Sequence, residues 1–85
     1  MPVFIETEWG IQKGNSFAGR RDGEWRAWNS DGELQAIAFF ENGKKEGTWL
    51  IYNREGKLLY SLHYDNGQLN VAKEWGANGE LVAVK

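Results

Sequence analysis

The sequence predicts an all-β fold, a single twisted antiparallel sheet built as a β-meander of repeated hairpins. Asn-Gly and Asp-Gly pairs recur along the chain and supply residues that tolerate the positive φ of hairpin turns. Strand-length apolar and aromatic segments lie between these turns. The same residue pattern returns about every 24 residues. With 85 residues, the chain has room for one small domain only.

The repeat is clearest when Gly23–Leu34 is compared with Gly47–Leu58. Glycine, tryptophan, an aromatic residue, asparagine, glycine and leucine recur in order, each displaced by 24 positions. A third and more divergent copy, Asn70–Leu81, follows with a spacing of 23. We therefore divide the domain, residues 1–85, into a degenerate cap at residues 1–18 and repeats at about 19–42, 43–66 and 67–85.

The elements are expected in the following order. The cap should hold one strand or a pair of strands, with a turn at Lys13-Gly14-Asn15. Leu34–Phe40 and Leu58–Tyr64 have the length and composition of strands. Asn70–Gly76 resembles a short helix with Asn70 as its N-cap, but alignment with the other repeats favours a strand.

The turn at Asn53–Gly56 suits a type I turn followed by a glycine bulge, which predicts a register. If Asn53 faces Lys57, then Tyr52 faces Leu58. Extending this register places six residues on one face of the sheet: Tyr52, Leu58, Leu50, Tyr60, Thr48 and Leu62. The opposite face would then carry Trp49, Ile51, Leu59, Ser61 and His63.

In the preceding hairpin, Trp28 is expected to face Leu34 on the first side of the sheet. The second side would hold Trp25, Ala27, Ile37 and Phe39. Neither face is therefore predicted to be wholly polar.

The linker between repeats needs a bulge. A two-residue Asn42-Gly43 turn pairs Glu41 with Lys44. This register would place Trp49 opposite Ala36, although the two residues are expected on different faces of the sheet. A one-residue bulge at Gly47 would remove the conflict. The third copy lacks both this glycine and one residue, as expected for a strand without the bulge.

Composition excludes several classes of protein. The chain has no cysteine and a single histidine, which excludes disulfides and metal sites built on cysteine or several histidines. Ten basic against twelve acidic residues give a net charge of −2, which argues against nucleic-acid binding. The first residues lack the features of a signal peptide, and no apolar run is long enough to span a membrane. We expect a cytoplasmic protein without a cofactor or a bound metal.

The pattern Gly-x-Trp-x-x-Tyr-x-x-x-Gly-x-Leu, joined to aromatic-x-Asn-Gly-Lys-x-x-Gly, resembles the MORN-variant repeat found in bacterial YwqK-type antitoxins. The second copy, Gly47–Leu58 with the preceding Phe40–Gly43, fits best, and Gly23–Leu34 fits well. The third copy keeps Trp75 but has Asn70 and Ala72 where the glycine and tryptophan belong. The resemblance covers roughly residues 19–82. It implies an elongated antiparallel β-meander, no catalytic residues, and neutralisation of a partner by binding.

Aromatic and basic residues are the candidates for partner binding. Trp25 and Trp49 occupy equivalent positions, as do Trp28, Tyr52 and Trp75, and we expect two ladders on opposite faces of the sheet. A chain this short cannot cover both faces, so one ladder should bind a partner. The basic candidates are the linker pairs Arg20-Arg21 and Lys44-Lys45, which occupy equivalent positions in two repeats. Solvated turn residues are the simpler interpretation of these pairs.

Catalysis is not expected. Ser61 and His63 lie two residues apart on a predicted strand, where side chains start about 7 Å apart, too far for an easy hydrogen bond. No other catalytic pattern is present, so the chain is predicted not to be an enzyme.

These observations favour a non-catalytic protein-binding module that neutralises or inhibits a larger partner, of the antitoxin, immunity or phage anti-defence type. The partner would be a protein such as a toxin or defence effector, or a second copy of the chain. The alternative is a lipid- or membrane-associated MORN-type scaffold, which would need a basic face that a net charge of −2 does not favour.

Overall fold

The computed structural model describes residues 2–7 and 10–85, with side chains from Gly10 onward. The described residues form the following strands: β1 (Pro2–Thr7), β2 (Gly10–Phe17), β3 (Arg20–Asn29), β4 (Leu34–Glu41), β5 (Lys44–Lys45), β6 (Gly47–Tyr52), β7 (Leu58–Asp65), β8 (Gln68–Trp75) and β9 (Leu81–Val84).

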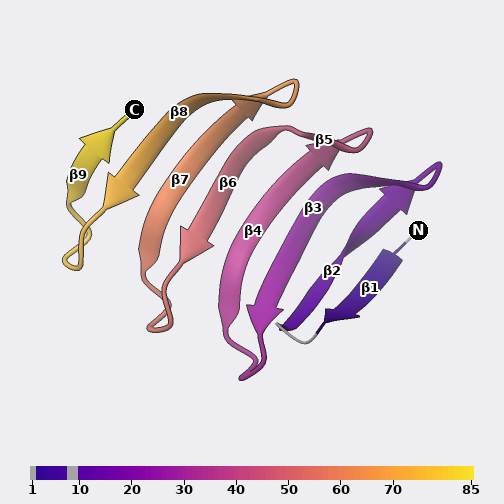
Figure 1. Cartoon of the computed structure of the whole chain (residues 1–85), viewed down its shortest axis with the longest axis horizontal. Coiled ribbons are helices and arrows are strands. Elements are labelled where there is room, and N and C mark those ends of the chain that lie inside the picture. Colours follow the sequence, from indigo (N-terminus) through magenta and orange to yellow (C-terminus); the bar gives the residue numbers. More distant parts are fainter. Residues whose placement is uncertain (1, 8–9) are drawn as a thin grey trace.

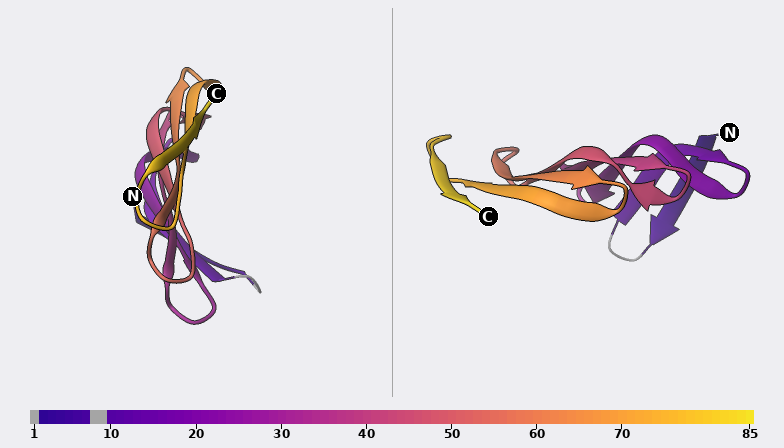
Figure 2. Two further views of the ribbon diagram at one scale, coloured as in Figure 1. Left: turned by 90° about the vertical axis from the view of Figure 1, so that its left-hand side faces the viewer. Right: turned by 90° about the horizontal axis from the view of Figure 1, so that it is seen from above.

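The strands make one open antiparallel sheet in the order β1-β2-β3-β4-β6-β7-β8-β9, and the two-residue β5 pairs with β4 ahead of β6. Apart from the short β5, each strand pairs with the next strand along the chain, so the prediction of a β-meander is confirmed (Figure 1). The sheet measures 39 × 32 × 15 Å and is a single twisted layer when seen edge-on (Figure 2). No helix capable of spanning a membrane occurs among the described residues.

Two kinds of turn alternate at the two ends of the sheet (Figure 1). At one end, Ala18-Gly19, Asn42-Gly43 and Asn66-Gly67 all have positive φ, the conformation of two-residue type I′ turns. At the other end, the turns that begin at Asn29 and Asn53 are longer. The Asn53 side chain organises its turn, because its Oδ1 accepts hydrogen bonds from the Glu55 and Lys57 amides at 2.9 and 3.0 Å.

The cap is a pair of strands, β1 and β2, as the sequence allowed. The predicted turn at Lys13-Gly14-Asn15 is wrong, because these residues lie inside β2 and pair with both β1 and β3. The glycine is needed there for another reason. Gly14 lies opposite Trp25, and the indole ring occupies the space that a side chain would fill.

The register predicted for β6 and β7 holds only at the turn. Tyr52 does pair with Leu58, but Leu59 then bulges out, so Leu50 pairs with Ser61 and not with Tyr60. For the same reason, Thr48 pairs with His63 and not with Leu62 as predicted. One residue of slip exchanges the faces of every later side chain in β7.

The corrected faces of this hairpin are as follows. Trp49 and Ile51 share their face with Tyr60 and Leu62, whereas Thr48, Leu50, Ser61 and His63 lie on the other.

The hairpin of β3 and β4 has the same bulge. Trp28 faces Leu34 as predicted, Gln35 bulges, and Ala27 then pairs with Ala36. Ile37 and Phe39 therefore lie on the opposite face from Trp25 and Ala27, which corrects the predicted grouping of these four residues.

The linker bulge is at the predicted place but is larger than predicted. Glu41 pairs with Lys44 as expected, but the register moves by two residues, not one, before Leu50 pairs with Ile37. Gly47 adopts a φ of 75° within this segment. The preceding repeat has an identical shift around Gly23, whose φ is 79°. A shift of two residues preserves the alternation of side chains across the bulge.

The third copy keeps a smaller bulge, where none was expected. The register between β7 and β8 moves by one residue, at Asn70. The loss of one residue relative to the other repeats therefore shortens the bulge but does not abolish it. The prediction that Asn70–Gly76 is not helical is confirmed, because β8 extends to Trp75.

Candidate functional site

The two predicted aromatic ladders lie on opposite faces of the sheet. Trp25 and Trp28 are three residues apart in β3, so their side chains point to opposite sides. Residues that pair across adjacent strands lie on the same face of the sheet, so the members of each ladder can be followed from strand to strand. We call the first ladder the cation-covered row and define it as Trp25, Phe40, Trp49 and Tyr64. The second, the open row, consists of Trp28, Tyr52 and Trp75 with their leucine partners Leu34, Leu58 and Leu81.

Rings of the cation-covered row contact one another continuously. Their centroids are 6.4 Å apart from Trp25 to Phe40, 5.1 Å from Phe40 to Trp49 and 5.2 Å from Trp49 to Tyr64. Trp25 is the most deeply buried hydrophobic side chain of the described residues, with 4% of its surface exposed. The Nε1 groups of Trp25 and Trp49 donate to the backbone oxygens of Asn15 and Phe39, both at 2.9 Å. This row is the structural core of a molecule that has only one layer.

Two basic side chains cover this row. The Arg21 guanidinium lies 4.7 Å from the Trp25 centroid and 5.4 Å from that of Phe40. The Lys45 ammonium lies 5.1 Å from the ring centroids of both Trp49 and Tyr64. These are the distances of cation–π contacts. Arg21 and Lys45, predicted as partner-binding residues, are therefore occupied by contacts within the protein.

The other linker residues join one repeat to the next. The Glu46 carboxylate accepts a hydrogen bond from the Asn66 amide at 2.7 Å, and Asp22 accepts one from the Asn42 amide at 3.3 Å. Arg20 donates to the Asn42 side chain at 3.1 Å. Lys44 is exposed beside this turn. Each linker therefore fastens the two-residue turn that follows it in the chain.

The open row differs from the cation-covered row in that the cation–π contacts of Arg21 and Lys45 are all made with rings of the other row. Trp28, Tyr52 and Trp75 are half-buried, each paired with its leucine across the adjoining strand. Because β3, β6 and β8 alternate with β4, β7 and β9, successive members of the row are two strands apart, or about 10 Å. No second layer covers this face among the described residues.

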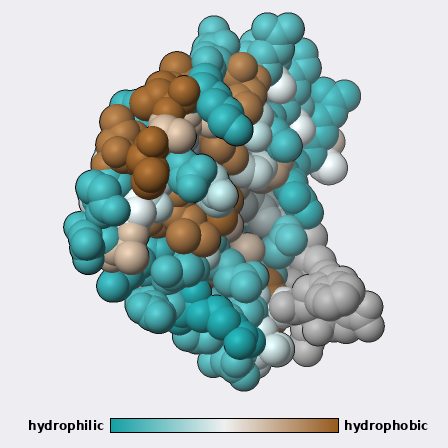
Figure 3. Space-filling view, turned by 60° about the vertical axis from the view of Figure 1, so that its left-hand side comes forward, coloured by the Kyte–Doolittle hydropathy of each residue, from teal (hydrophilic) through white to brown (hydrophobic). Residues whose placement is uncertain are grey.

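The third repeat ends the cation-covered row. Leu69 occupies the position equivalent to Arg21 and Lys45, and Ala72 occupies that of Trp25 and Trp49. Leu69 is consequently 50% exposed beside Tyr64, with which it pairs. Several other exposed apolar residues lie in the same third of the chain: Leu81, Val82 and Val84. Figure 3, which brings the β9 side of the sheet forward, shows apolar side chains gathered among hydrophilic ones.

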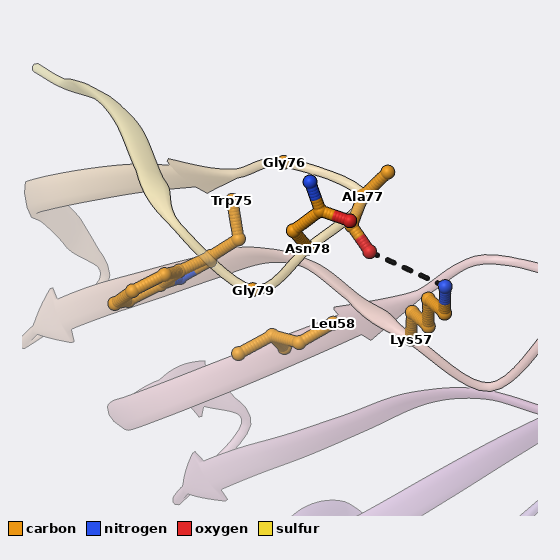
Figure 4. Close-up of a pocket in the computed structure, with 7 residues that line it drawn as sticks. All are labelled: Lys57, Leu58, Trp75, Gly76, Ala77, Asn78 and Gly79. Atoms are coloured by element: carbon orange, nitrogen blue, oxygen red, sulfur yellow. Dashed lines mark hydrogen bonds between the residues drawn. The ribbon is translucent and has the colours of Figure 1, made fainter.

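A hollow of about 590 Å³ lies at the end of the open row, beside the last long turn. Figure 4 shows the Trp75 ring and the Leu58 side chain along one side of this hollow, with the turn Gly76–Gly79 bordering it. The Lys57 ammonium donates to the Ala77 oxygen at 3.2 Å and so bridges the turns of two repeats. The hollow combines an aromatic surface with an aliphatic one.

The polar candidates do not converge on a reactive centre. His63 lies opposite Thr48, whose Oγ1 is 3.4 Å from Nδ1, and Ser61 Oγ instead accepts a hydrogen bond from Trp75 Nε1 at 3.2 Å. Among the residues that the structure describes, no group of three or more histidine, aspartate or glutamate side chains could hold a metal ion.

Sequence reasoning identified both ladders but did not predict that Arg21 and Lys45 cover one of them. Phe40 and Tyr64 were not included in a ladder, although their spacing of 24 was visible. The partners Leu34 of Trp28 and Leu58 of Tyr52 were predicted, whereas the hollow beside Trp75 was not.

Comparison with known proteins identifies the repeat. The family model described as MORN repeat variant matches residues 21–42 and 45–66, together just over half of the chain. No curated protein and no solved structure matches the chain. The two matched segments each begin at the linker cation of one repeat, Arg21 or Lys45, and end at the asparagine of the next two-residue turn, Asn42 or Asn66.

Proposed function

Because the chain belongs to the MORN repeat variant family, we propose that it is a non-catalytic protein-binding module that neutralises a larger partner protein through the open row. The family is a repeat module, and such modules commonly bind proteins or membranes. The antitoxin role comes from the sequence resemblance described above. One structural observation supports the choice of surface: the open row carries half-buried rings that nothing else in the described chain covers.

The composition of the open row suits a protein partner. Tryptophan and tyrosine are enriched at the energetic centres of protein interfaces, where a few residues carry most of the binding energy. The basic residues Arg21 and Lys45 lie over aromatic rings on the other face, so they do not form a free basic patch for anionic lipid. The open row therefore favours a protein over a membrane.

The experiment uses the purified chain as bait in extracts of its source cells. Proteins recovered by the wild type are identified, and the activity of each is assayed with and without the chain. Trp75→Ala and Tyr52→Ala should lose the partner, whereas Tyr60→Ala, which removes an exposed ring from the opposite face, should retain it.

The proposal predicts that one captured protein loses its activity on binding. Capture that is insensitive to Trp75→Ala and Tyr52→Ala would contradict the assignment of the surface. Sedimentation with anionic liposomes in place of a protein partner would support the membrane scaffold instead. Circular dichroism of each variant confirms that the sheet is intact.

A further inference from the structure

A second hollow, of about 150 Å³, lies on the face of the sheet that carries the cation-covered row. Three alanines and three rings of that row give it an apolar lining. We call it the alanine hollow and define it by these residues: Ala27, Ala36, Ala38, Trp25, Phe40 and Trp49. A cavity of this volume can hold one six-membered ring.

The three alanines create this space. Ala27 pairs with Ala36 across the β3–β4 hairpin. Ala38 pairs with Trp25 in the same hairpin, so the alanines and this ring share one face. The next repeat has larger side chains 24 positions later, and they pair in the same way: Ile51 with Tyr60, and Leu62 with Trp49. The hollow is therefore peculiar to one repeat and is not a consequence of the fold.

Arg21 supplies the alanine hollow with a cation whose hydrogen-bond donors are unused. Its guanidinium lines the hollow, 4.7 Å from the Trp25 centroid and 5.4 Å from that of Phe40. None of the ion pairs or side-chain hydrogen bonds within the described part of the chain uses this guanidinium. Arg26 also lines the hollow, but it is paired with the Glu24 carboxylate at 3.0 Å. No carboxylate of the described residues lines the hollow, so Arg21 is a positive group without an anion.

From this arrangement we infer that the alanine hollow binds a small aromatic carboxylate, with the ring against the alanines and the carboxylate on the Arg21 guanidinium. A planar guanidinium presents parallel N–H donors that match the two oxygens of a carboxylate, and charge-assisted pairs of this kind are strong. The cation–π contacts hold the guanidinium beside the hollow in advance. The inference goes beyond the proposed function, because it concerns the opposite face of the sheet and a ligand of a different class.

Gln12 and the two tryptophans would complete the site. Gln12 lies opposite Ala27 across β2 and β3 and lines the hollow, where its amide can donate a further hydrogen bond to the carboxylate. The Trp25 and Trp49 rings are fixed by hydrogen bonds from their Nε1 groups to backbone oxygens, both at 2.9 Å. Side chains that are already ordered lose little further entropy when a ligand binds.

The next repeat provides an internal control. Lys45 occupies the position equivalent to Arg21 and lies 5.1 Å from the ring centroids of Trp49 and Tyr64. Lys45 is not among the residues that line the alanine hollow. Neutralising Lys45 changes the net charge of the chain by the same amount as neutralising Arg21, and it leaves the site intact.

The test titrates phenylacetate, a carboxylate joined to one aromatic ring, into the isotopically labelled chain and follows the indole N–H resonances by NMR. The resonances of Trp25 and Trp49 should shift, and those of Trp28 and Trp75 should not. A Kd on the order of 1 mM is expected for so small a ligand. Acetate, which lacks the ring, and benzyl alcohol, which lacks the charge, should each bind about tenfold more weakly.

Substitutions separate the two parts of the site. Arg21→Gln should weaken phenylacetate binding by about tenfold, whereas Lys45→Gln should leave it unchanged. Ala38→Leu should abolish binding, because the larger side chain fills the hollow, and Leu62 shows that the repeat accepts leucine at this position. If circular dichroism shows that Ala38→Leu does not fold, Ala27→Ile, which copies Ile51, replaces it.

Absence of any indole shift during the titration would overturn the inference. So would binding of acetate or benzyl alcohol as tight as that of phenylacetate, because the site would then recognise a charge or a ring but not both. Equal weakening by Arg21→Gln and Lys45→Gln, or unchanged binding by a folded Ala38→Leu, would contradict the location. Capture of a protein through the open row succeeds or fails independently of these results.

Discussion

Gly14 and Trp25 lie opposite each other across the β2–β3 pair, and a Cβ added to Gly14 would overlap the indole ring of Trp25. The indole is 4% exposed and donates to the Asn15 oxygen at 2.9 Å. Through this contact, the cap strand β2 encloses the first ring of the cation-covered row.

Gly14→Ala should therefore destabilise the protein, although alanine ordinarily stabilises a strand relative to glycine. The added methyl group must displace Trp25, and overpacking of this kind costs about 1–3 kcal/mol. Urea denaturation measures the change. Lys13→Ala, an exposed substitution in the same strand, is the control and should change the free energy of unfolding by less than about 0.5 kcal/mol. A neutral or stabilising Gly14→Ala would contradict the packing.

Glu46 is predicted to hold two repeats together. Its carboxylate accepts the Asn66 amide at 2.7 Å, across the linker. Glu46→Ala leaves that amide to solvent and should lower the free energy of unfolding by about 1 kcal/mol. The matched control is Glu41→Ala, an exposed acid at the preceding turn. Equal effects of the two substitutions in urea denaturation would show that the hydrogen bond contributes nothing.

Asn53 should stabilise the protein through its side-chain oxygen alone. Asn53→Ala removes the acceptor for the amides of Glu55 and Lys57, and about 1 kcal/mol of stability should be lost. Asn53→Asp keeps an oxygen at this position and should lose less. Thermal unfolding followed by circular dichroism distinguishes them. If the aspartate variant is as unstable as the alanine variant, the side-chain oxygen does not organise the turn.

Gly47 is predicted to be required for its backbone conformation, not for space. A Cβ there would meet only Phe39 Cβ, at 3.8 Å, which is an ordinary contact. At a φ of 75°, however, Gly47→Ala should cost about 1–2 kcal/mol. Gly47→Asn should cost less, because asparagine tolerates this conformation and adopts it at Asn42 and Asn66 in this chain. Equal melting temperatures for the two variants would contradict this explanation.

The fold could be predicted from the sequence because its determinants are local. Asn42-Gly43 and Asn66-Gly67 fix two-residue turns, and the spacing of 24 fixes which strands are equivalent. The register could not be predicted fully, because a bulge is decided by packing on both faces at once. Leu59, the residue that bulges, has no glycine or other local signal.

The candidate site, like the fold, could be predicted only in part from the sequence. The two ladders and their opposite faces follow from the spacing of Trp25, Trp28 and Trp49, but the sequence does not reveal which ladder is covered. Which ladder is covered depends on where the Arg21 and Lys45 side chains lie once the register has shifted by two residues at the linker bulge. From the sequence, solvated turns were the simpler interpretation of the basic pairs and a binding patch was the alternative; neither predicted these contacts with the rings.

The placement of the faces depends above all on the register of β6 against β7, and backbone nuclear Overhauser contacts test it directly. The structure predicts cross-strand contacts between Leu50 and Ser61 and between Thr48 and His63. Contacts from Leu50 to Tyr60 and from Thr48 to Leu62 would contradict it. In that case Leu59 would not bulge, and the face assigned to each side chain of β7 from Tyr60 onward would be reversed.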